Sequence, residues 1–85
     1  MKIREQLEEM NPKALLADGL DQALVGISEN HFHHENALAV YDIDKVISIL
    51  MDRDGMDRDG AVEFFEFNIK GSYVGENTPL FIDFK

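Results

Sequence analysis

The chain has 85 residues, of which 45% are hydrophobic, and its 17 acidic residues outnumber 8 lysines and arginines to give a net charge of −9. This composition predicts one small folded domain, residues 1–85, and argues against intrinsic disorder. Without a basic patch, direct nucleic-acid binding is not expected. Without cysteine, disulfides and thiolate metal sites are excluded.

No apolar run approaches the length of about 18 residues that crosses a bilayer, and MKIREQLEEM has no apolar signal-peptide core. We therefore expect a cytoplasmic protein without membrane contact. The acidic excess is typical of ordinary solubility. It also suits an acidic face that docks on a basic partner surface and resembles a nucleic acid in charge.

Two helices are predicted near the N-terminus. Apolar residues recur at helical spacing over residues 2–10. Asn11-Pro12 then favours the start of a second short helix, because asparagine is a good N-cap and proline suits the first helical position. Gly19 is a suitable end for that second helix.

A β-hairpin is predicted next. The apolar runs at 22–28 and 37–41 favour strands, and the polar stretch SENHFHHEN between them predicts a long or irregular loop. Histidines and a carboxylate in this loop could ligate zinc or nickel, but no HExxH helix supplies a further ligand. Surface histidines at a loop tip are the simpler interpretation. We predict no cofactor, and the weak metal candidates are His31, His33 and His34.

Two more helices and a strand are predicted in the second half. After a cap at Asp42, residues 43–53 place apolar side chains at i, i+3, i+4, i+7 and i+8. A further helix is predicted over 58–70, followed by the loop GSYVGENTP. The alternation of apolar residues in LFIDF predicts a strand over 80–84. The order α-α-β-β-α-α-β favours an α+β fold, with a three-stranded antiparallel or mixed sheet and helices mainly on one face.

The stretch DRDGMDRDG, residues 52–60, contains the same tetrapeptide twice and suggests a calcium loop. An EF-hand register that starts at Asp52 puts Met56 at a ligand position and Asp57 where glycine is needed, and a start at Asp57 fails as well. We interpret the stretch as a helix C-terminus at Gly55, an apolar contact at Met56 and a helix N-cap at Asp57.

The run YDIDKVISILMDRDGMDRDGAVEFFEFNIKGSYVGENTP, residues 41–79, resembles a group of small uncharacterised phage and bacterial proteins. Their pattern is YDxxKxIxxLMxRDGM followed by AVEFFEFNxxGxYVGExTP, and residues 11–27 resemble the part that precedes it. The resemblance implies no established activity. It implies a candidate shared loop site at Tyr41, Asn68, Tyr73, Glu76, Asn77 and Thr78. The alternative is that these residues fix loops by hydrogen bonding.

No phosphate-binding glycine loop, GxSxG motif or cysteine nucleophile is present, so an enzyme is not favoured. Our leading hypothesis is a non-enzymatic accessory protein of phage or prophage type that binds a host or phage macromolecule. The predicted partner-binding surface is acidic and partly aromatic, and comprises Asp52, Asp54, Asp57, Asp59, Glu63, Glu66, Phe64, Phe67 and Tyr73. For each residue taken alone, a simpler interpretation than partner binding is available: the aromatic residues pack in the core and the acidic residues are solvated.

Two other functions stay open. One is a small-ligand or metal-binding module built from the loops at 29–36 and 71–79. The other is a small enzyme of unknown class that uses tyrosine, asparagine and glutamate side chains from these loops. A surplus of apolar helix surface for so small a core also favours a homodimer.

Overall fold

The computed structural model describes residues 2–30, 33–71 and 74–84, and their side chains except those of residues 30 and 33–36. Its helices and strands follow one another along the chain as α1 (Ile3–Met10), the 3-10 turn η1 (Asp21–Ala23), β1 (Leu24–Asn30), β2 (His33–Asp42), α2 (Ile43–Asp54), α3 (Arg58–Phe64), the π-helical turn η2 (Phe65–Ile69) and β3 (Leu80–Ile82). This arrangement confirms the predicted α+β class.

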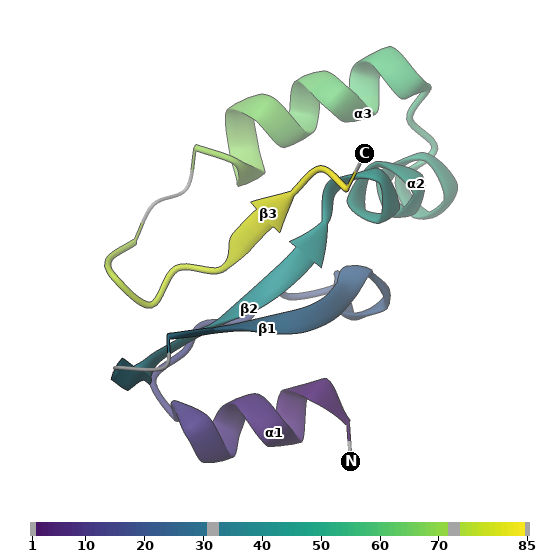
Figure 1. Ribbon diagram of the computed structural model, residues 1–85. Coiled ribbons are helices and arrows are strands. Elements are labelled where there is room, and N and C mark those ends of the chain that lie inside the picture. Colours follow the sequence, from purple (N-terminus) through teal and green to yellow (C-terminus); the bar gives the residue numbers. More distant parts are fainter. Residues whose placement is uncertain (1, 31–32, 72–73, 85) are drawn as a thin grey trace.

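The sheet is mixed, with strand order β1-β2-β3. β1 pairs with β2 antiparallel, and β3 pairs with β2 parallel. Figure 1 shows α1 beside β1, α3 beside β3, and α2 at the carboxyl end of β2. Because paired residues point to the same face, the register puts Ile27, Ala39, Tyr41 and Phe81 on one face, and Gly26, Val40 and Leu80 on the other.

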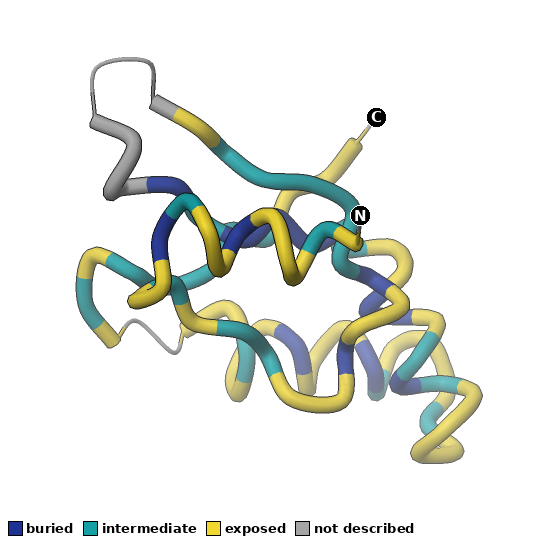
Figure 2. The backbone as a smooth tube through the Cα atoms, turned by 90° about the horizontal axis from the view of Figure 1, so that it is seen from below, coloured by how far each residue is buried: buried dark blue, intermediate teal, exposed yellow. Residues whose placement is uncertain are grey.

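One hydrophobic core lies on the first of these faces. All the α-helices contribute to it, with Leu7 from α1, Leu50 from α2 and Ala61 from α3, and the buried residues follow the inner side of each helix in Figure 2. The helices therefore lie mainly on one face, as predicted. Three aromatic rings join the strands to the last helix. Tyr41 stacks on Phe81 with 5.3 Å between the ring centroids, and Phe65 lies edge-on to Phe81 with 5.6 Å between the centroids.

The second short helix predicted between Asn11 and Gly19 is wrong. Residues 12–13 form a turn and residues 14–17 have no regular structure. The amide of Leu15 donates to the Asn77 carbonyl and that of Ala17 to the Tyr41 hydroxyl. Distant segments thus satisfy backbone groups that a helix would have paired locally.

The long loop predicted within the hairpin is also wrong. β1 runs to Asn30 and β2 begins at His33, so only residues 31–32 lie between the strands. The pairing shifts register between Ser28↔Leu38 and Asn30↔His33. This irregularity lets a polar, unevenly spaced stretch pair as strand, because a bulge absorbs extra residues on one side.

The interpretation of DRDGMDRDG as two helix ends is confirmed. Gly55 has a left-handed backbone with φ of 70°, and its amide donates to the Leu50 carbonyl. Met56 packs against the core. The carboxylate of Asp57 accepts a 2.7 Å hydrogen bond from the amide of Gly60, as an N-cap does.

The predicted helix over 58–70 and the predicted strand over 80–84 are both present, with changes at their ends. The helix is α-helical only to Phe64, and then η2 widens into a π-helix in which the Lys70 amide donates to the Phe65 carbonyl. The strand ends at Ile82, and the side chain that reaches the core from it is Phe81. Within the described ranges, no helix has the length and apolar character to cross a membrane.

Candidate functional site

The predicted acidic residues all lie exposed on one continuous stretch of helix and corner, from the last turns of α2 through α3 to η2. We call this stretch, together with its two exposed phenylalanines, the acidic–aromatic surface. Its members are Asp52, Asp54, Asp57, Asp59, Glu63, Glu66, Phe64 and Phe67. Tyr73, which was predicted with them, lies outside the described residues.

Three of these carboxylates already have partners in the chain. Asp54 accepts two hydrogen bonds, of 3.0 and 2.9 Å, from the Arg53 guanidinium, and these lower the pKa of Asp54 below its usual value. Asp57 caps α3. Glu66 pairs with Lys70 at 3.4 Å across one helical turn. Their charges are partly neutralised or used for folding, so they are the less available members of the surface.

The other three carboxylates belong to Asp52, Asp59 and Glu63. Each is exposed, and none makes a hydrogen bond or ion pair within the part of the chain that the structure describes. Exposed, unpaired carboxylates cost nothing to hold in water and are available to a cationic partner. These residues carry the free negative charge of the surface.

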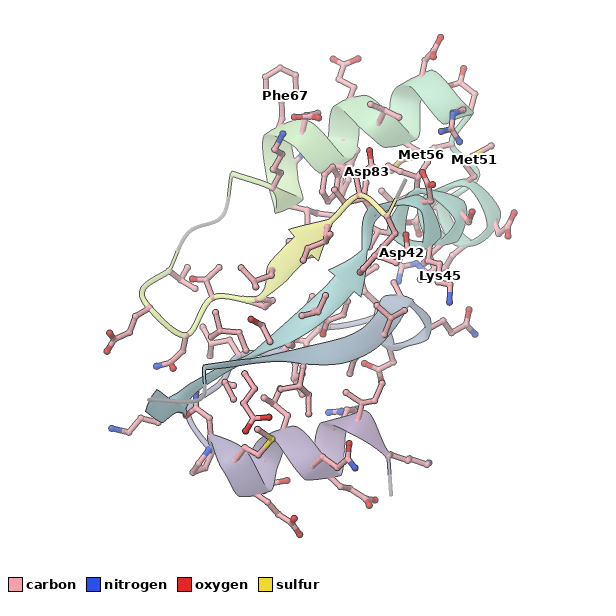
Figure 3. All side chains as sticks on the ribbon, in the orientation of Figure 1. Asp42, Lys45, Met51, Met56, Phe67 and Asp83 are labelled. Carbon is pink, nitrogen blue, oxygen red and sulfur yellow. The ribbon has the colours of Figure 1, made fainter. Side chains whose placement is uncertain are left out.

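The phenylalanines of this helix separate into core and surface residues. Phe65 is 2% exposed and belongs to the core, whereas Phe64 is 38% exposed and Phe67 is 78% exposed. Figure 3 shows Phe67 pointing away from the sheet at the η2 end of the helix. Core packing therefore explains Phe65 but not Phe67. Its position in a π-helical turn is notable because such turns are frequent at functional sites.

The candidate loop residues mainly hold the chain together. The side-chain oxygen of Asn77 accepts a hydrogen bond from the Asn11 amide, and Asn68 donates to the Phe64 carbonyl. The Thr78 hydroxyl accepts from the Val74 amide and donates to the Gly75 carbonyl. Glu76 is exposed. The bonds of Asn68 and Thr78 go to the backbone of their own segments, and that of Asn77 goes to Asn11, so the arrangement favours the loop-fixing interpretation.

Asn11 is a residue whose importance sequence reasoning missed. It was expected only as a helix cap, yet it is 3% exposed and bonds across the molecule. Its side-chain amide donates to the Ala37 carbonyl at 2.9 Å and to Asn77 at 3.1 Å, while its oxygen accepts from the Lys13 amide. An asparagine before proline looks like any other turn residue, so no local signal would have revealed these partners.

Tyr41, another candidate loop-site residue, is fully buried, and its hydroxyl accepts a 2.9 Å hydrogen bond from the Ala17 amide. Burial raises the pKa of the Tyr41 hydroxyl above its ordinary value of 10.0. Because the folded pKa is the higher one, the unfolded chain ionises first as the pH rises. The stability linked to the neutral hydroxyl is thus present below pH 10 and is lost above it.

Tyr41→Phe is therefore expected to lower the free energy of unfolding at pH 7 by about 1 kcal/mol, because the Ala17 amide loses its acceptor. The difference in the free energy of unfolding between wild type and variant should become smaller as the pH rises above about 10. There only the wild type loses stability, because only it has a hydroxyl at this position that ionises. Urea denaturation at a series of pH values measures both effects. A gap that stays constant through alkaline pH would contradict the role given to burial.

The metal-binding alternative has no support among the described residues. No group of histidine, aspartate and glutamate side chains that could hold a metal ion occurs there. His31 lies outside the described residues, as do the side chains of His33 and His34. The 29–36 segment is mostly strand backbone rather than a loop. The histidine site stays an untested prediction.

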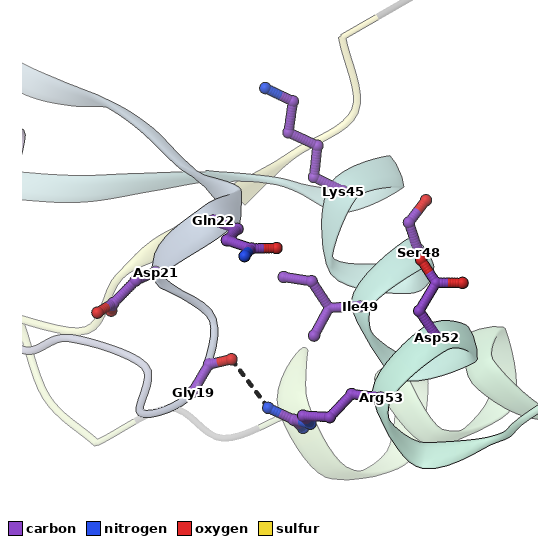
Figure 4. Close-up of a pocket in the computed structure, with 8 residues that line it drawn as sticks. All are labelled: Gly19, Asp21, Gln22, Lys45, Ser48, Ile49, Asp52 and Arg53. Carbon is purple, nitrogen blue, oxygen red and sulfur yellow. Dashed lines mark hydrogen bonds between the residues drawn. The ribbon is translucent and has the colours of Figure 1, made fainter.

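A shallow groove of about 680 Å³ lies between η1 and α2, next to the acidic–aromatic surface. Arg53 lies at its floor and donates to the Gly19 carbonyl, while Lys45 points away from Arg53 and Ile49 fills the middle (Figure 4). A catalytic site needs polar groups that converge on one point. The groove has no such constellation among its lining residues, so we assign it no reaction.

Comparison of the chain with protein-family models, curated proteins and solved structures finds no match. The resemblance to phage and bacterial proteins over residues 11–27 and 41–79 therefore stays a prediction.

Proposed function

We propose that the protein is a non-enzymatic accessory protein of phage or prophage type that binds a host or phage macromolecule through the acidic–aromatic surface. The partner presents a basic patch with an apolar pocket at its centre or edge. A cytoplasmic location is part of the proposal, and the absence of cysteine suits a reducing compartment.

The observation that carries the proposal is the pairing of Phe67 with free carboxylates on one helix. Phe67 leaves 78% of its surface in water, one turn after the unpaired carboxylate of Glu63. Burying a phenylalanine on a partner gains about 1.5–3 kcal/mol. A few anchor residues that fill pockets near the centre of an interface, large aromatic ones among them, carry most of its binding energy.

The net charge supports a basic partner in particular. At −9, the chain repels acidic molecules and attracts cationic ones, which raises the rate of encounter. Charged groups at the rim of an interface mainly affect association rate and selectivity. The carboxylates therefore select and steer the partner, and Phe67 holds it.

Affinity capture from lysates of candidate bacterial hosts tests the proposal with two separate variants. Phe67→Ser removes the aromatic anchor, and the pair Asp59→Lys and Glu63→Lys reverses the free charge without touching the cap at Asp57. A basic partner is expected with wild type, with recovery reduced about tenfold or more in each variant, since each 1.4 kcal/mol lost is a factor of ten. Recovery should also fall at high salt.

The matched control reverses the same amount of charge elsewhere. Glu8→Lys with Glu9→Lys changes two exposed carboxylates on α1, which lies on the β1 side of the sheet, away from α3 (Figure 1). This control should capture the partner as wild type does. A partner that binds the Phe67 variant normally, or that is lost equally from the α1 control, would refute the proposed surface.

A further inference from the structure

β1 forms one edge of the sheet, and the side of this strand that faces away from β2 is open. The strand order β1-β2-β3 pairs β1 with β2 alone. In an antiparallel pair, alternate residues point their N–H and C=O groups away from the neighbouring strand. Residues 25–28 are partly exposed, and within the described part of the chain no turn, loop or cap bond reaches their backbone. The outward-facing amides and carbonyls are therefore available to an added strand.

Two grooves meet at this edge, one on each face of the sheet. The first has a volume of about 630 Å³ and lies between α1 and β1, which run side by side in Figure 1. The second, of about 550 Å³, lies on the face opposite the helices. Both grooves are lined by Val25, Gly26 and Ile27. Because successive side chains of a strand point to opposite faces, a strand added here places its side chains alternately in the two grooves.

The groove between α1 and β1 combines apolar side chains with carboxylates. Met10 and Ile27 are partly buried and pack against the core, whereas Glu9 and Glu29 are exposed. No lysine or arginine is among the residues that line this groove. The Glu9 carboxylate makes no hydrogen bond or ion pair with the described residues. A lysine or arginine side chain suits this groove, because its aliphatic stem packs on apolar surface while its charge reaches a carboxylate.

The groove on the opposite face has room for an apolar side chain. Gly26 has no side chain, and a Cβ placed on it would meet no atom within 4 Å. Ser28, the next residue of β1 on this face, is also small, and Val40 of β2 lies opposite Gly26. An apolar side chain of an added strand can therefore lie over this gap beside Val40. Together the two grooves favour a strand in which basic and apolar residues alternate.

The β1 strand of a second copy is a poorer occupant of this edge than a short basic strand. The pairing with β2 is regular only over Gly26–Ser28, with a register shift on either side. Such irregularities hinder the pairing of two long edges, but they leave a straight stretch for a short segment. A second copy also carries a charge of −9 and repels the first, whereas a basic segment is attracted.

We propose that the open edge of β1 binds a short extended segment of another protein, with alternating basic and apolar residues, which adds to the sheet as a further strand. Backbone hydrogen bonds to β1 hold the segment, and its basic side chains lie between α1 and β1 beside Glu9. This inference goes beyond the proposed function and does not depend on it, because α3 and η2 lie on the β3 side of the sheet (Figure 1).

Nuclear magnetic resonance titration with a synthetic peptide of alternating lysine and valine tests this proposal. We expect saturable binding and slower hydrogen exchange of backbone amides within residues 25–29. The same peptide methylated at every backbone amide should bind at least about tenfold more weakly, because it can no longer donate the hydrogen bonds of a strand. A peptide of alternating glutamate and valine should also bind at least about tenfold more weakly, because like charges meet at Glu9.

Glu9→Lys is expected to raise the dissociation constant of the lysine–valine peptide about tenfold, because a cation replaces the carboxylate that the lysines approach. Glu63→Lys is the matched control, since it makes the same change of charge at an exposed residue of α3. It should change the dissociation constant by no more than about twofold at physiological salt, where charges far from the peptide are screened.

Four results would each overturn the proposal. They are an absence of saturable binding, unchanged hydrogen exchange in β1, equally tight binding of the methylated peptide, and equal weakening by Glu9→Lys and Glu63→Lys. The last would show that the peptide responds only to the net charge of the chain. None of these results bears on capture through Phe67, so this proposal and the proposed function fail independently.

Discussion

Phe65→Ala is expected to leave the chain largely unfolded at 25 °C. The ring is 2% exposed and lies edge-on to Phe81, which in turn stacks on Tyr41. Removing a buried phenylalanine costs about 3–5 kcal/mol. A domain of this size without disulfides has a total stability of about 5 kcal/mol, so this loss removes most of it. Urea denaturation followed by circular dichroism measures the change.

The matched control is Phe67→Ala, two residues along the same helical turn. Because Phe67 is 78% exposed, its truncation should change the free energy of unfolding by no more than about 0.5 kcal/mol. The same substitution thus separates a core phenylalanine from a surface one. Equal destabilisation by the two variants would show that Phe67 is buried in solution, and it would also remove the main support for the proposed partner surface.

Asn11→Ala is expected to destabilise the protein by about 2–3 kcal/mol, because it leaves buried polar groups without partners. The Ala37 carbonyl loses the bond from the Asn11 side chain at a point where the β1–β2 register is irregular. The Asn77 side chain loses its donor as well, so the loop after η2 is released from the N-terminal segment. Chemical denaturation gives the energy, and hydrogen exchange in residues 74–79 reports the release of the loop.

Asn77→Ala is the partner control for this prediction. It removes one hydrogen bond, and the bond from the Leu15 amide to the Asn77 backbone carbonyl remains. Its cost should be about 0.5–1.5 kcal/mol, clearly less than that of Asn11→Ala. If both variants cost the same, the bond to the Ala37 carbonyl contributes nothing and the stabilising role lies in the Asn11–Asn77 pair alone.

Helix ends and helix faces were predicted correctly from short stretches of sequence. Each of these helix ends depends only on residues within about one or two turns of it. They are the cap at Asp42, the left-handed glycine at Gly55 and the cap at Asp57. The exposure of the acidic residues also followed from helical periodicity. The same periodicity separated the aromatic residues, because Phe65 shares the buried side of the helix with Ala61, whereas Phe64 and Phe67 were predicted on the surface. The tertiary structure decided what covers Phe65, since Phe81 from β3 lies edge-on to it.

Local sequence was sufficient for the α+β class, for helices α1, α2 and α3, and for the doubled tetrapeptide, because periodicity and capping are short-range effects. The segment at 14–17 became irregular because Tyr41 and Asn77, far along the chain, bond its amides. The polar stretch after Ser28 became strand because β2 was there to pair with it. The buried role of Asn11 likewise arises only when β2 and the loop before β3 meet the N-terminal segment. The hydrogen-bond partners of these backbone and side-chain groups lie far along the chain, so a short stretch of sequence cannot predict them.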